Sequence, residues 1–456
     1  MRKFIAILTA KIVQGAIRIA QKGSGSALPG LIAQKIDPTI ISNLAGMLPK
    51  GIILVTGTNG KTTTVKMIAG ILKESGLRVV CNFNGSNLSR GLASMLIQHA
   101  DLAGTRMNGD IGLFEVDEAV MPEVTAKLNP NIIVVTNLFR DQLDRYGELD
   151  KTAEIIGSAL KSVPQARMIL NADDPLVANL STYNANVSYF GIDSDYKAFS
   201  QGPVDLQRCL SCKAELAYHR RYFSHLGNYY CPKCHRSRPE LDYLLKEISL
   251  TMNGSSARFM ASGANEDITI KLPGFYNLYN SLAAASVAEY IQVPKATIRQ
   301  ALAATSAPFG RMEKISLSDD KNIFLILVKN PTSFIQSLDT LGLYNRRSKL
   351  LLALNDNLAD GTDISWIWDV DFKTVSDFVE KIFVSGLRAE DMELRLKYAG
   401  FTKNMIVREN KLSSALETAV SQLDQGETLY VFPTYTAMLT LRRVLADKAL
   451  VKGLME

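Results

Sequence analysis

The chain has 456 residues, of which 47% are hydrophobic and 21% charged; this composition is typical of globular proteins and excludes wholesale disorder. At roughly 150 residues per domain, the length predicts two or three domains. The 51 basic and 45 acidic residues give an excess too small to argue for nucleic-acid binding alone, although it suits a polyanionic substrate or an anionic membrane surface. Five cysteines are too few for a disulfide framework, and no apolar run reaches the roughly 18 residues of a membrane span. We expect a cytoplasmic protein.

Residues 1–40 are expected to form a basic amphipathic helix followed by a linker. The apolar run from Phe4 to Ala10 is interrupted by Lys11 and then by Arg18, and no clear small-residue cleavage site follows, so the segment does not read as a signal peptide. We expect the helix to pack on the body of the protein. Contact with a membrane surface is the alternative, because the segment is both basic and amphipathic.

Two series of apolar runs alternate with helical stretches along the rest of the chain. The first, expected over residues 41–313, predicts strands at GIILVTG, LRVVCNF, IGLFEVDE, NIIVVTN and RMILNAD. The second, over 314–456, predicts strands at NIFLILVKN, SKLLLALND, EKIFVSG, NMIVREN and TLYVFP. Such alternation favours an α/β fold with mostly parallel, doubly wound sheets, and the second series reads as a separate Rossmann-like domain.

A phosphate-binding loop is predicted directly after the first strand, with a helix opening at about Lys61. Glycines let the backbone aim its N–H groups at phosphate oxygens, the helix N-terminus adds positive potential, and a lysine reaches the terminal phosphates. A threonine hydroxyl can bind Mg²⁺. We expect nucleotide binding by a continuous set of residues: Gly57, Thr58, Asn59, Gly60, Lys61, Thr62 and Thr63.

Glu115 is the expected carboxylate ligand of Mg²⁺. It closes the predicted strand IGLFE, and open α/β sheets place their sites at the carboxyl ends of strands. Mg²⁺ beside phosphates takes one or two carboxylates. The alternative is an ordinary solvated carboxylate in a strand–helix loop.

Four of the five cysteines form two C-x-x-C pairs, Cys209–Cys212 and Cys231–Cys234, separated by 18 residues. Two such pairs complete a closed tetrahedral site, so we expect structural Zn²⁺ in an insert at about residues 201–240. Nucleic-acid binding by this basic ribbon is an alternative that we do not expect. His219, His225 and His235 read as surface or packing residues, and Cys81 as a core residue.

These motifs together resemble the Mur ligase superfamily, which comprises ATP-dependent amide-forming enzymes. The matching segments are TGTNGKTTT, EVDEA, TNLFRDQLDRYG, LNADDP, GFYNLYNSLAAA and FGRME. The resemblance implies that Glu115 binds Mg²⁺, that Asn277 and Asn280 lie near the adenine, and that Arg311 contacts the ATP phosphates.

The departures from this family pattern are specific. Gln142 stands where the family usually has a metal-binding histidine, and Tyr276 replaces another. These ligases commonly carry a carbamylated lysine, for which Lys151 is only a weak candidate. The phosphate loop begins near residue 57, so we expect no UDP-binding domain ahead of it.

The Cys₄ insert, with DNLADGTDISWIWDVDF and YTAML, resembles the MurT-type ligase subunits of lipid II isoglutaminyl synthase. That resemblance implies a heterodimer with a class I-type glutaminase. It also implies ATP-dependent amidation, through an acyl phosphate, of the α-carboxylate of D-glutamate in the lipid II stem peptide, which yields D-isoglutamine. The alternatives are a Mur- or folylpolyglutamate-type ligase that joins an amino acid to a carboxylate, and an ATP-gated zinc-ribbon binding module.

A division of labour follows from the residues as well. A class I glutaminase needs a cysteine nucleophile and a histidine base, but no cysteine follows Cys234 and no histidine follows His235. Ammonia must therefore come from a partner or from free ammonium.

The resemblance also implies that the ligase subunit lends an acidic residue to the partner's Cys–His pair. We expect Asp356, at the end of KLLLALND, with Asp360 and Asp363 as rivals; helix capping is the alternative for all three.

Three further residues each have two possible roles. Trp366 and Trp368 are expected in the core, with a partner interface as the alternative, and Lys329 reads as a surface lysine that could instead assist a carboxylate or acyl phosphate.

Overall fold

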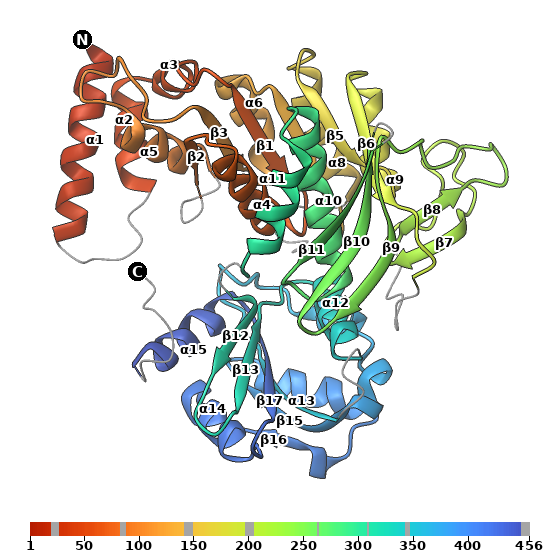
Figure 1. The fold of residues 1–456 in the computed structure, drawn as a ribbon. Coiled ribbons are helices and arrows are strands. Elements are labelled where there is room, and N and C mark those ends of the chain that lie inside the picture. Colours follow the sequence, from red (N-terminus) through yellow and green to blue (C-terminus); the bar gives the residue numbers. More distant parts are fainter. Residues whose placement is uncertain are drawn as a thin grey trace.

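The computed structural model describes residues 1–19, 27–82, 88–140, 149–196, 205–261, 264–307, 310–342 and 347–447. These residues form a nine-stranded sheet, a six-stranded sheet and a separate two-stranded hairpin. The nine-stranded sheet and its helices lie above the six-stranded sheet in the view of Figure 1. Among the described helices, none combines the length and apolar character needed to cross a membrane.

The larger sheet has the strand order β11-β10-β9-β6-β5-β4-β1-β3-β2. Pairing is parallel from β2 to β9 and antiparallel from β9 to β11. All five strands predicted for this part of the chain are present. The bounds are β1 Ile52–Thr56, β2 Val79–Cys81, β3 Ile111–Glu115, β4 Ile132–Val135, β5 Arg167–Asn171, β6 Val187–Ile192, β9 Tyr243–Thr251, β10 Gly254–Ala261 and β11 Ala264–Ile270.

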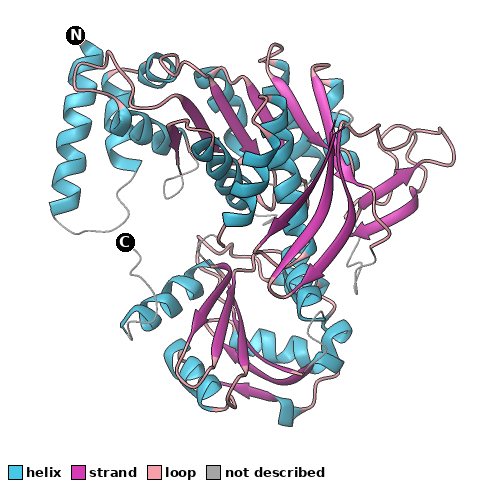
Figure 2. Ribbon diagram, viewed as in Figure 1, coloured by secondary structure: helices cyan, strands magenta, loops and turns pink. Residues whose placement is uncertain are grey.

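Helices cover both faces of this sheet (Figure 2). Alternate residues of β1 point to opposite faces, so Ile53 and Val55 enter one core while Ile52 and Leu54 enter the other. The first core is closed by α4 Lys61–Glu74, α10 Phe275–Tyr290 and α11 Lys295–Ala304. The second is closed by α5 Ser89–His99, α6 Met121–Leu128, α8 Leu149–Lys161 and α9 Pro175–Asn179, with short 3₁₀ turns η2 Glu118–Val120 and η3 Leu180–Thr182.

The N-terminal segment contains more helix than the sequence suggested. The expected amphipathic helix is α1 Arg2–Ile19, but the region expected to be a linker contains α2 Leu28–Ile36, and α3 Ile40–Ala45 follows. Ala6, Ile7, Ala10 and Ala33 are buried in the second core. The linker expectation was wrong there because these small and branched apolar residues complete the covering of the sheet.

The antiparallel strands β9–β11 were not predicted either. Their burial alternates along β10, the period-two signature of a half-covered sheet, and that signal follows directly after the cysteine-rich segment. That segment contains a hairpin of β7 Ala217–Phe223 and β8 Leu226–Tyr230. The hairpin and α1 lie at opposite ends of the larger sheet (Figure 1).

The smaller sheet has the order β12-β13-β17-β14-β15-β16 and is parallel except for β12. The five strands predicted for the second series are present, and an unpredicted first strand begins at Arg311, ahead of the boundary expected at residue 314. The strand bounds are β12 Arg311–Ser316, β13 Asn322–Ile326, β14 Ser348–Ala353, β15 Val379–Ser385, β16 Ile406–Arg408 and β17 Thr428–Pro433. The helices are α12 Pro331–Leu341, α13 Ala389–Tyr398, α14 Leu412–Ser421 and α15 Tyr435–Asp447, with 3₁₀ segments η5 Ser365–Asp369, η6 Phe372–Phe378 and η7 Lys403–Met405.

Candidate active site

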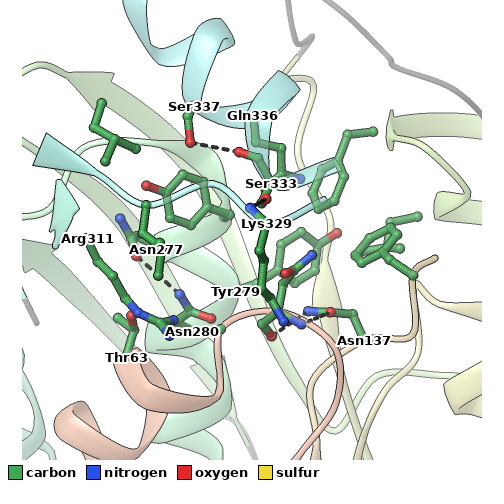
Figure 3. Close-up of a pocket in the computed structure, with 18 residues that line it drawn as sticks. Thr63, Asn137, Asn277, Tyr279, Asn280, Arg311, Lys329, Ser333, Gln336 and Ser337 are labelled. Atoms are coloured by element: carbon green, nitrogen blue, oxygen red, sulfur yellow. Dashed lines mark hydrogen bonds between the residues drawn. The ribbon is translucent and has the colours of Figure 1, made fainter. Parts of the chain in front are cut away.

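A pocket of about 810 Å³, including space open to solvent, lies where the two sheets meet. Its walls come from the β1–α4 loop, the segment after β4, the β7–β8 hairpin, α10, β12–β13 and α12 (Figure 3). The walls include Asn59, Gly60, Thr63, Asn277, Asn280 and Arg311 of the residues expected to bind nucleotide.

The phosphate loop has a backbone that only glycine accommodates at two points. Gly57 and Gly60 have φ values of +120° and +86°. A Cβ at Gly57 would collide with Thr136 Oγ1, and a Cβ at Gly60 would collide with Asn280 Oδ1. Both residues therefore let neighbouring polar side chains approach the loop closely.

The loop is fixed from the end of β4. Asn59 donates its backbone N–H to Asn137 Oδ1 at 2.8 Å, and Asn137 Nδ2 donates to Asn59 O at 3.1 Å. Thr136 Oγ1 donates to the same carbonyl at 2.8 Å. The threonine–asparagine pair of TNLFRDQLDRYG thus holds the phosphate loop in place, a role that the sequence analysis did not assign to it.

Lys61 is held at the centre of the loop. Its Nζ donates to Gly57 O at 2.5 Å and lies 3.1 Å from Glu118 Oε1. Burial opposes the charge of this ammonium, but Glu118, Glu115 and Asp117 outweigh that effect and raise the pKa of Lys61. Lys61 is therefore held in its charged form beside the pocket, although it does not line the pocket itself. Glu118, the second glutamate of EVDEA, is buried and was missed by the sequence analysis.

Thr62 and Glu115 are brought together as expected for a magnesium site. Thr62 Oγ1 donates to Glu115 Oε2 at 2.7 Å. Asn82, just after β2, brackets the backbone of Glu115 with two hydrogen bonds of 2.9 Å. A hydroxyl and a carboxylate oxygen beside a phosphate loop fit the oxygen-ligand preference of Mg²⁺.

Three residues from α10 and β12 that were expected to bind nucleotide lie together in the pocket wall. Asn280 Nδ2 donates to Asn277 Oδ1 at 3.1 Å, and Asn277 Nδ2 is anchored on Pro273 O at 2.7 Å. Arg311 reaches towards Thr63 and Asn280 (Figure 3).

The side chain of Gln336 on α12 also lines this pocket. Its Nε2 is a buried donor that has no hydrogen-bond partner among the described residues. An unsatisfied buried donor fits a polar ligand. No motif around Gln336 predicted this position.

Lys329 does not lie on the surface, and that expectation was wrong. Because the chain turns from β13 into α12 directly above the phosphate loop, Lys329 Nζ donates to Thr58 O at 3.0 Å. The next residue, Asn330, donates through Nδ2 to Asn59 Oδ1 at 3.2 Å and caps α12 by accepting from Ser333 N at 2.8 Å. The smaller sheet thus contributes directly to the pocket.

The four cysteines of the insert form the one group of metal-ligating side chains found in the described part of the chain, with all sulfurs within 4.8 Å of one another. Cys209 and Cys234 Sγ lie 3.6 Å apart, and Cys212 and Cys231 Sγ lie 3.4 Å apart. A zinc–sulfur bond of about 2.3 Å places tetrahedral ligands about 3.8 Å apart, so the cluster fits Zn²⁺.

The cysteine-rich segment contacts the pocket. Its hairpin supplies Phe223 and Leu226 to the pocket wall. Arg238 forms an ion pair of 2.6 Å with buried Asp173, which also accepts from the Tyr279 hydroxyl at 2.7 Å. Burial raises the pKa of Asp173, and Arg238 counters that rise. The cluster and the pocket therefore share one set of buried contacts.

The remaining expected packing residues divide as follows. Cys81 is buried in the first core, as predicted. His225 is fully buried, and its ring lies 5.0 Å from that of Phe139 at a tilt of 54°. Its Nε2 lies 3.3 Å from Asp174 Oδ1, so His225 packs in the interior, as predicted. His219 and His235 are exposed. Lys151 is exposed in the first turn of α8 and is absent from the pocket wall, while Gln142 lies outside the described residues.

The three candidate aspartates follow β14 and differ in their surroundings. Asp360 is buried and accepts two hydrogen bonds from Thr436, at 2.7 and 2.5 Å. Asp363 accepts from Ser365 N at 2.8 Å. Asp356 is partly exposed and pairs with Arg388 at 2.7 Å. Asp356 is therefore the carboxylate of the three that combines exposure with a position at the strand end.

The two tryptophans lie in different environments. Trp366 packs against the core formed around Phe334, with ring centroids 6.3 Å apart, as predicted. Trp368 is 47% exposed, so the core expectation was wrong for this residue. Its ring lies 5.5 Å from the ring of exposed Tyr398 and under the guanidinium of Arg395.

Comparison with known proteins decides the family. Residues 55–214 match the Mur ligase middle domain, and residues 327–438 match the MurT ligase C-terminal family. The chain is 35% identical over 443 residues to the lipid II isoglutaminyl synthase (glutamine-hydrolyzing) subunit MurT of Streptococcus pneumoniae, covering 95% of each chain. The chain belongs to the MurT family. The subunit of the same name from Staphylococcus aureus is 32% identical over 96% of each chain.

Solved structures agree with the MurT-family fold at greater distance. A pseudomurein peptide ligase type C from Methanothermus fervidus aligns with a TM-score of 0.70 at 22% identity, over 89% of this chain and 80% of that one. MurF from Acinetobacter baumannii aligns at 0.66 and 15%, over 91% and 80%. These structures show the fold. The match to the Mur ligase middle domain and the 35% identical MurT subunit show that the chain is a Mur ligase-type enzyme, a family that implies ATP and Mg²⁺ as cofactors.

Proposed function

We propose that this chain is the ligase subunit of a lipid II isoglutaminyl synthase. It would use ATP to convert the α-carboxylate of D-glutamate in the lipid II stem peptide into a carboxamide, giving D-isoglutamine. One observation carries the proposal: in a chain 35% identical to such a subunit, Asn59, Gly60 and Arg311 line one pocket. Lys61 and the Thr62–Glu115 pair lie at the same loop, although they do not line the pocket themselves.

The phosphates of ATP would lie on the loop of residues 57–63. Lys61 and Arg311 supply fixed positive charge there, and Thr62 and Glu115 would hold Mg²⁺, which neutralises charge on the transferring phosphoryl group. Asn277 and Asn280 would contact the adenine. Gln336 Nε2, a buried donor that lacks a partner among the described residues, is suited to a polar atom of the nucleotide.

The chemistry takes two substitutions. A carboxylate oxygen of the substrate attacks the γ-phosphorus of ATP, the bond to the β-phosphate oxygen breaks, and ADP leaves an acyl phosphate. The nitrogen of ammonia then attacks the acyl carbon, the carbon–oxygen bond to phosphate breaks, and a proton from the nitrogen is lost to solvent. The main tasks of the chain are positioning and charge neutralisation.

We propose that Lys329 helps to bind the carboxylate of the substrate near the terminal phosphate of ATP. Its ammonium is held 3.0 Å from Thr58 O, beside the loop where the terminal phosphate would lie. A cation at that position favours the approach of an anionic carboxylate to an anionic phosphate.

Ammonia would come from a class I-type glutaminase in a heterodimer with this chain. Asp356 would orient the histidine of the partner's Cys–His pair, as the third member of a triad does. Its partial exposure at the end of β14 supports this choice over buried Asp360.

Zn²⁺ would be bound by Cys209, Cys212, Cys231 and Cys234. With four thiolates it would be a structural ion that stabilises a ribbon at about residues 201–240. We propose the corresponding division of the chain into an N-terminal helical segment of residues 1–40, an ATP-binding part of 41–313 that contains the ribbon, and a Rossmann-like part of 314–456.

Phosphate release by the purified chain tests the proposed function. With ATP, Mg²⁺ and lipid II, we expect sustained release of phosphate only when ammonium is also added. ATP turnover that is indifferent to both lipid II and ammonium would contradict the proposal. A screen of amino acids as donors separates the amino-acid ligase alternative, which predicts turnover with one of them and none with ammonium.

Because lipid II carries a lipid anchor, the enzyme would work in the cytoplasm at the inner face of the membrane.

A further inference from the structure

One face of helix α1 is apolar and exposed. Phe4, Ile5, Leu8 and Ile12 have exposed fractions of 45%, 43%, 37% and 63%. Their spacing of three and four residues places them on one side of the helix, and we call these four residues the α1 face. The neighbouring helix α2 exposes Leu28 and Leu31 as well.

The opposite side of α1 holds the helix on the protein. Ala6, Ile7 and Ala10 are buried in the second core, and Lys11 Nζ donates to Ala100 O at 2.6 Å. Within the part of the chain that the structure describes, this side alone attaches α1 to the rest of the protein. The α1 face therefore has no partner there. A contiguous apolar surface of this kind marks an interaction site.

All charged residues of the N-terminal segment are basic. Residues 1–36 contain six basic residues and no acidic one, and these six equal the whole excess of 51 basic over 45 acidic residues in the chain. Arg2 and Lys35 are exposed. The sequence segment that contains the α1 face therefore has a formal charge of +6, equal to the net charge of the chain.

We propose that the α1 face lies in the interface of an anionic membrane and holds the enzyme at the bilayer surface. An amphipathic helix with basic flanks lies parallel to the membrane with its apolar side among the upper acyl chains, while lysines and arginines contact anionic headgroups. A second copy of this chain is disfavoured as the occupant, because it would bring two equally basic segments together. The inference draws on the proposed function only for the location of the substrate.

Sedimentation with lipid vesicles tests this proposal without ATP, lipid II or a partner. We expect the full-length chain to bind vesicles that contain phosphatidylglycerol more tightly than pure phosphatidylcholine vesicles, and to be released as salt rises. Leu8→Glu should weaken binding about tenfold or more, since burial of a leucine is worth about 1.5–3 kcal/mol. Leu394→Glu is the matched control, because Leu394 is 47% exposed on α13.

Ile12→Gln keeps the test decisive if Leu8→Glu unfolds, because Ile12 is the most exposed residue of the α1 face. Equal binding by wild type and both α1 variants, or no preference of the wild type for anionic vesicles, would overturn the proposal. A change in the oligomeric state of the α1 variants, without a change in vesicle binding, would show the face to be a protein interface instead. Neither result bears on phosphate release, so failure here is distinguishable from failure of the proposed function.

Discussion

Lys329 Nζ lies 3.0 Å from the carbonyl oxygen of Thr58, so a side chain that follows a strand of the smaller sheet contacts the phosphate loop of the larger one. Asn330 adds a second contact to the same loop, at 3.2 Å from Asn59 Oδ1. The smaller sheet therefore adds two contacts to a phosphate loop that Thr136 and Asn137 also hold.

Replacing Lys329 should lower the rate of the chemical step more than the affinity for ATP. In Lys329→Met we expect kcat to fall by about 10–10³-fold, because a fixed positive charge near the reacting carboxylate is lost, with a smaller change in the KM for ATP. Steady-state kinetics with ammonium as donor measure both parameters. Lys373→Met, at an exposed lysine of the same part of the chain, should leave both unchanged. An equal result for the two variants would remove Lys329 from the mechanism.

Weakening the Thr62–Glu115 pair should raise the requirement for Mg²⁺. Either Thr62→Ala or Glu115→Gln removes one oxygen ligand, and we expect half-maximal activity at about 10–100-fold more Mg²⁺. Glu123→Gln is the control, because Glu123 forms an ion pair with Lys127 on α6 instead. A magnesium titration of phosphate release distinguishes these outcomes. An unchanged magnesium curve in both loop variants would place the ion elsewhere.

The Lys61–Glu118 pair predicts a pH effect with a definite sign. The folded pKa of Lys61 is raised above its ordinary value of 10.5, so its charge and any stability from the pair are fully present below that value and are lost only as pH rises through the folded pKa. In Glu118→Gln the strongest raising influence is gone while burial still lowers the pKa. We expect ATP affinity in that variant to decline at lower alkaline pH than in wild type. Identical pH profiles of ATP binding would contradict this role for Glu118.

Removing the metal should weaken ATP binding at a distance. Cys212→Ser breaks the four-sulfur cluster. The hairpin that supplies Phe223 and Leu226 to the pocket lies between the two cysteine pairs, so we expect it to lose order with the metal. We expect loss of bound zinc and about tenfold weaker ATP binding, equivalent to about 1.4 kcal/mol. Lys233→Ala, an exposed change within the same cysteine-rich segment, should retain both. Metal analysis and calorimetry give the two readouts; zinc loss with unchanged ATP affinity would uncouple the sites.

Replacing Asp356 should lower the amidation activity with glutamine as the nitrogen source but not with ammonium. With the glutaminase bound, Asp356→Asn is expected to lower glutamine-dependent amidation by about 10²–10⁴-fold, as loss of the orienting carboxylate does in a catalytic triad. Ammonium-dependent amidation should be preserved. Asp363→Asn serves as the control, because Asp363 accepts a local backbone hydrogen bond from Ser365. Equal loss with both nitrogen sources would assign Asp356 a structural role.

Short sequence patterns correctly predicted the elements whose structure is determined by neighbouring residues. The continuous apolar runs correctly predicted the parallel strands, and the loop after β1 predicted α4 because glycine spacing and helix start are encoded within a few residues. Contacts between distant segments gave no such signal. The position of Lys329 over Thr58, the pairing of Lys61 with Glu118 and the burial of Glu118 depend on how β13, η2 and the loop meet in space. The alternation in β10 was readable but overlooked beside the cysteine-rich segment.

The most direct test of the account follows the nitrogen atom into the product. Wild-type chain, ATP, Mg²⁺ and lipid II would be incubated with isotopically labelled ammonium, and the stem peptide would be sequenced by tandem mass spectrometry. We expect one labelled nitrogen per stem peptide, in the α-carboxamide of the glutamate residue, with one ADP formed for each. An unlabelled product, or a label elsewhere in the peptide, would contradict it.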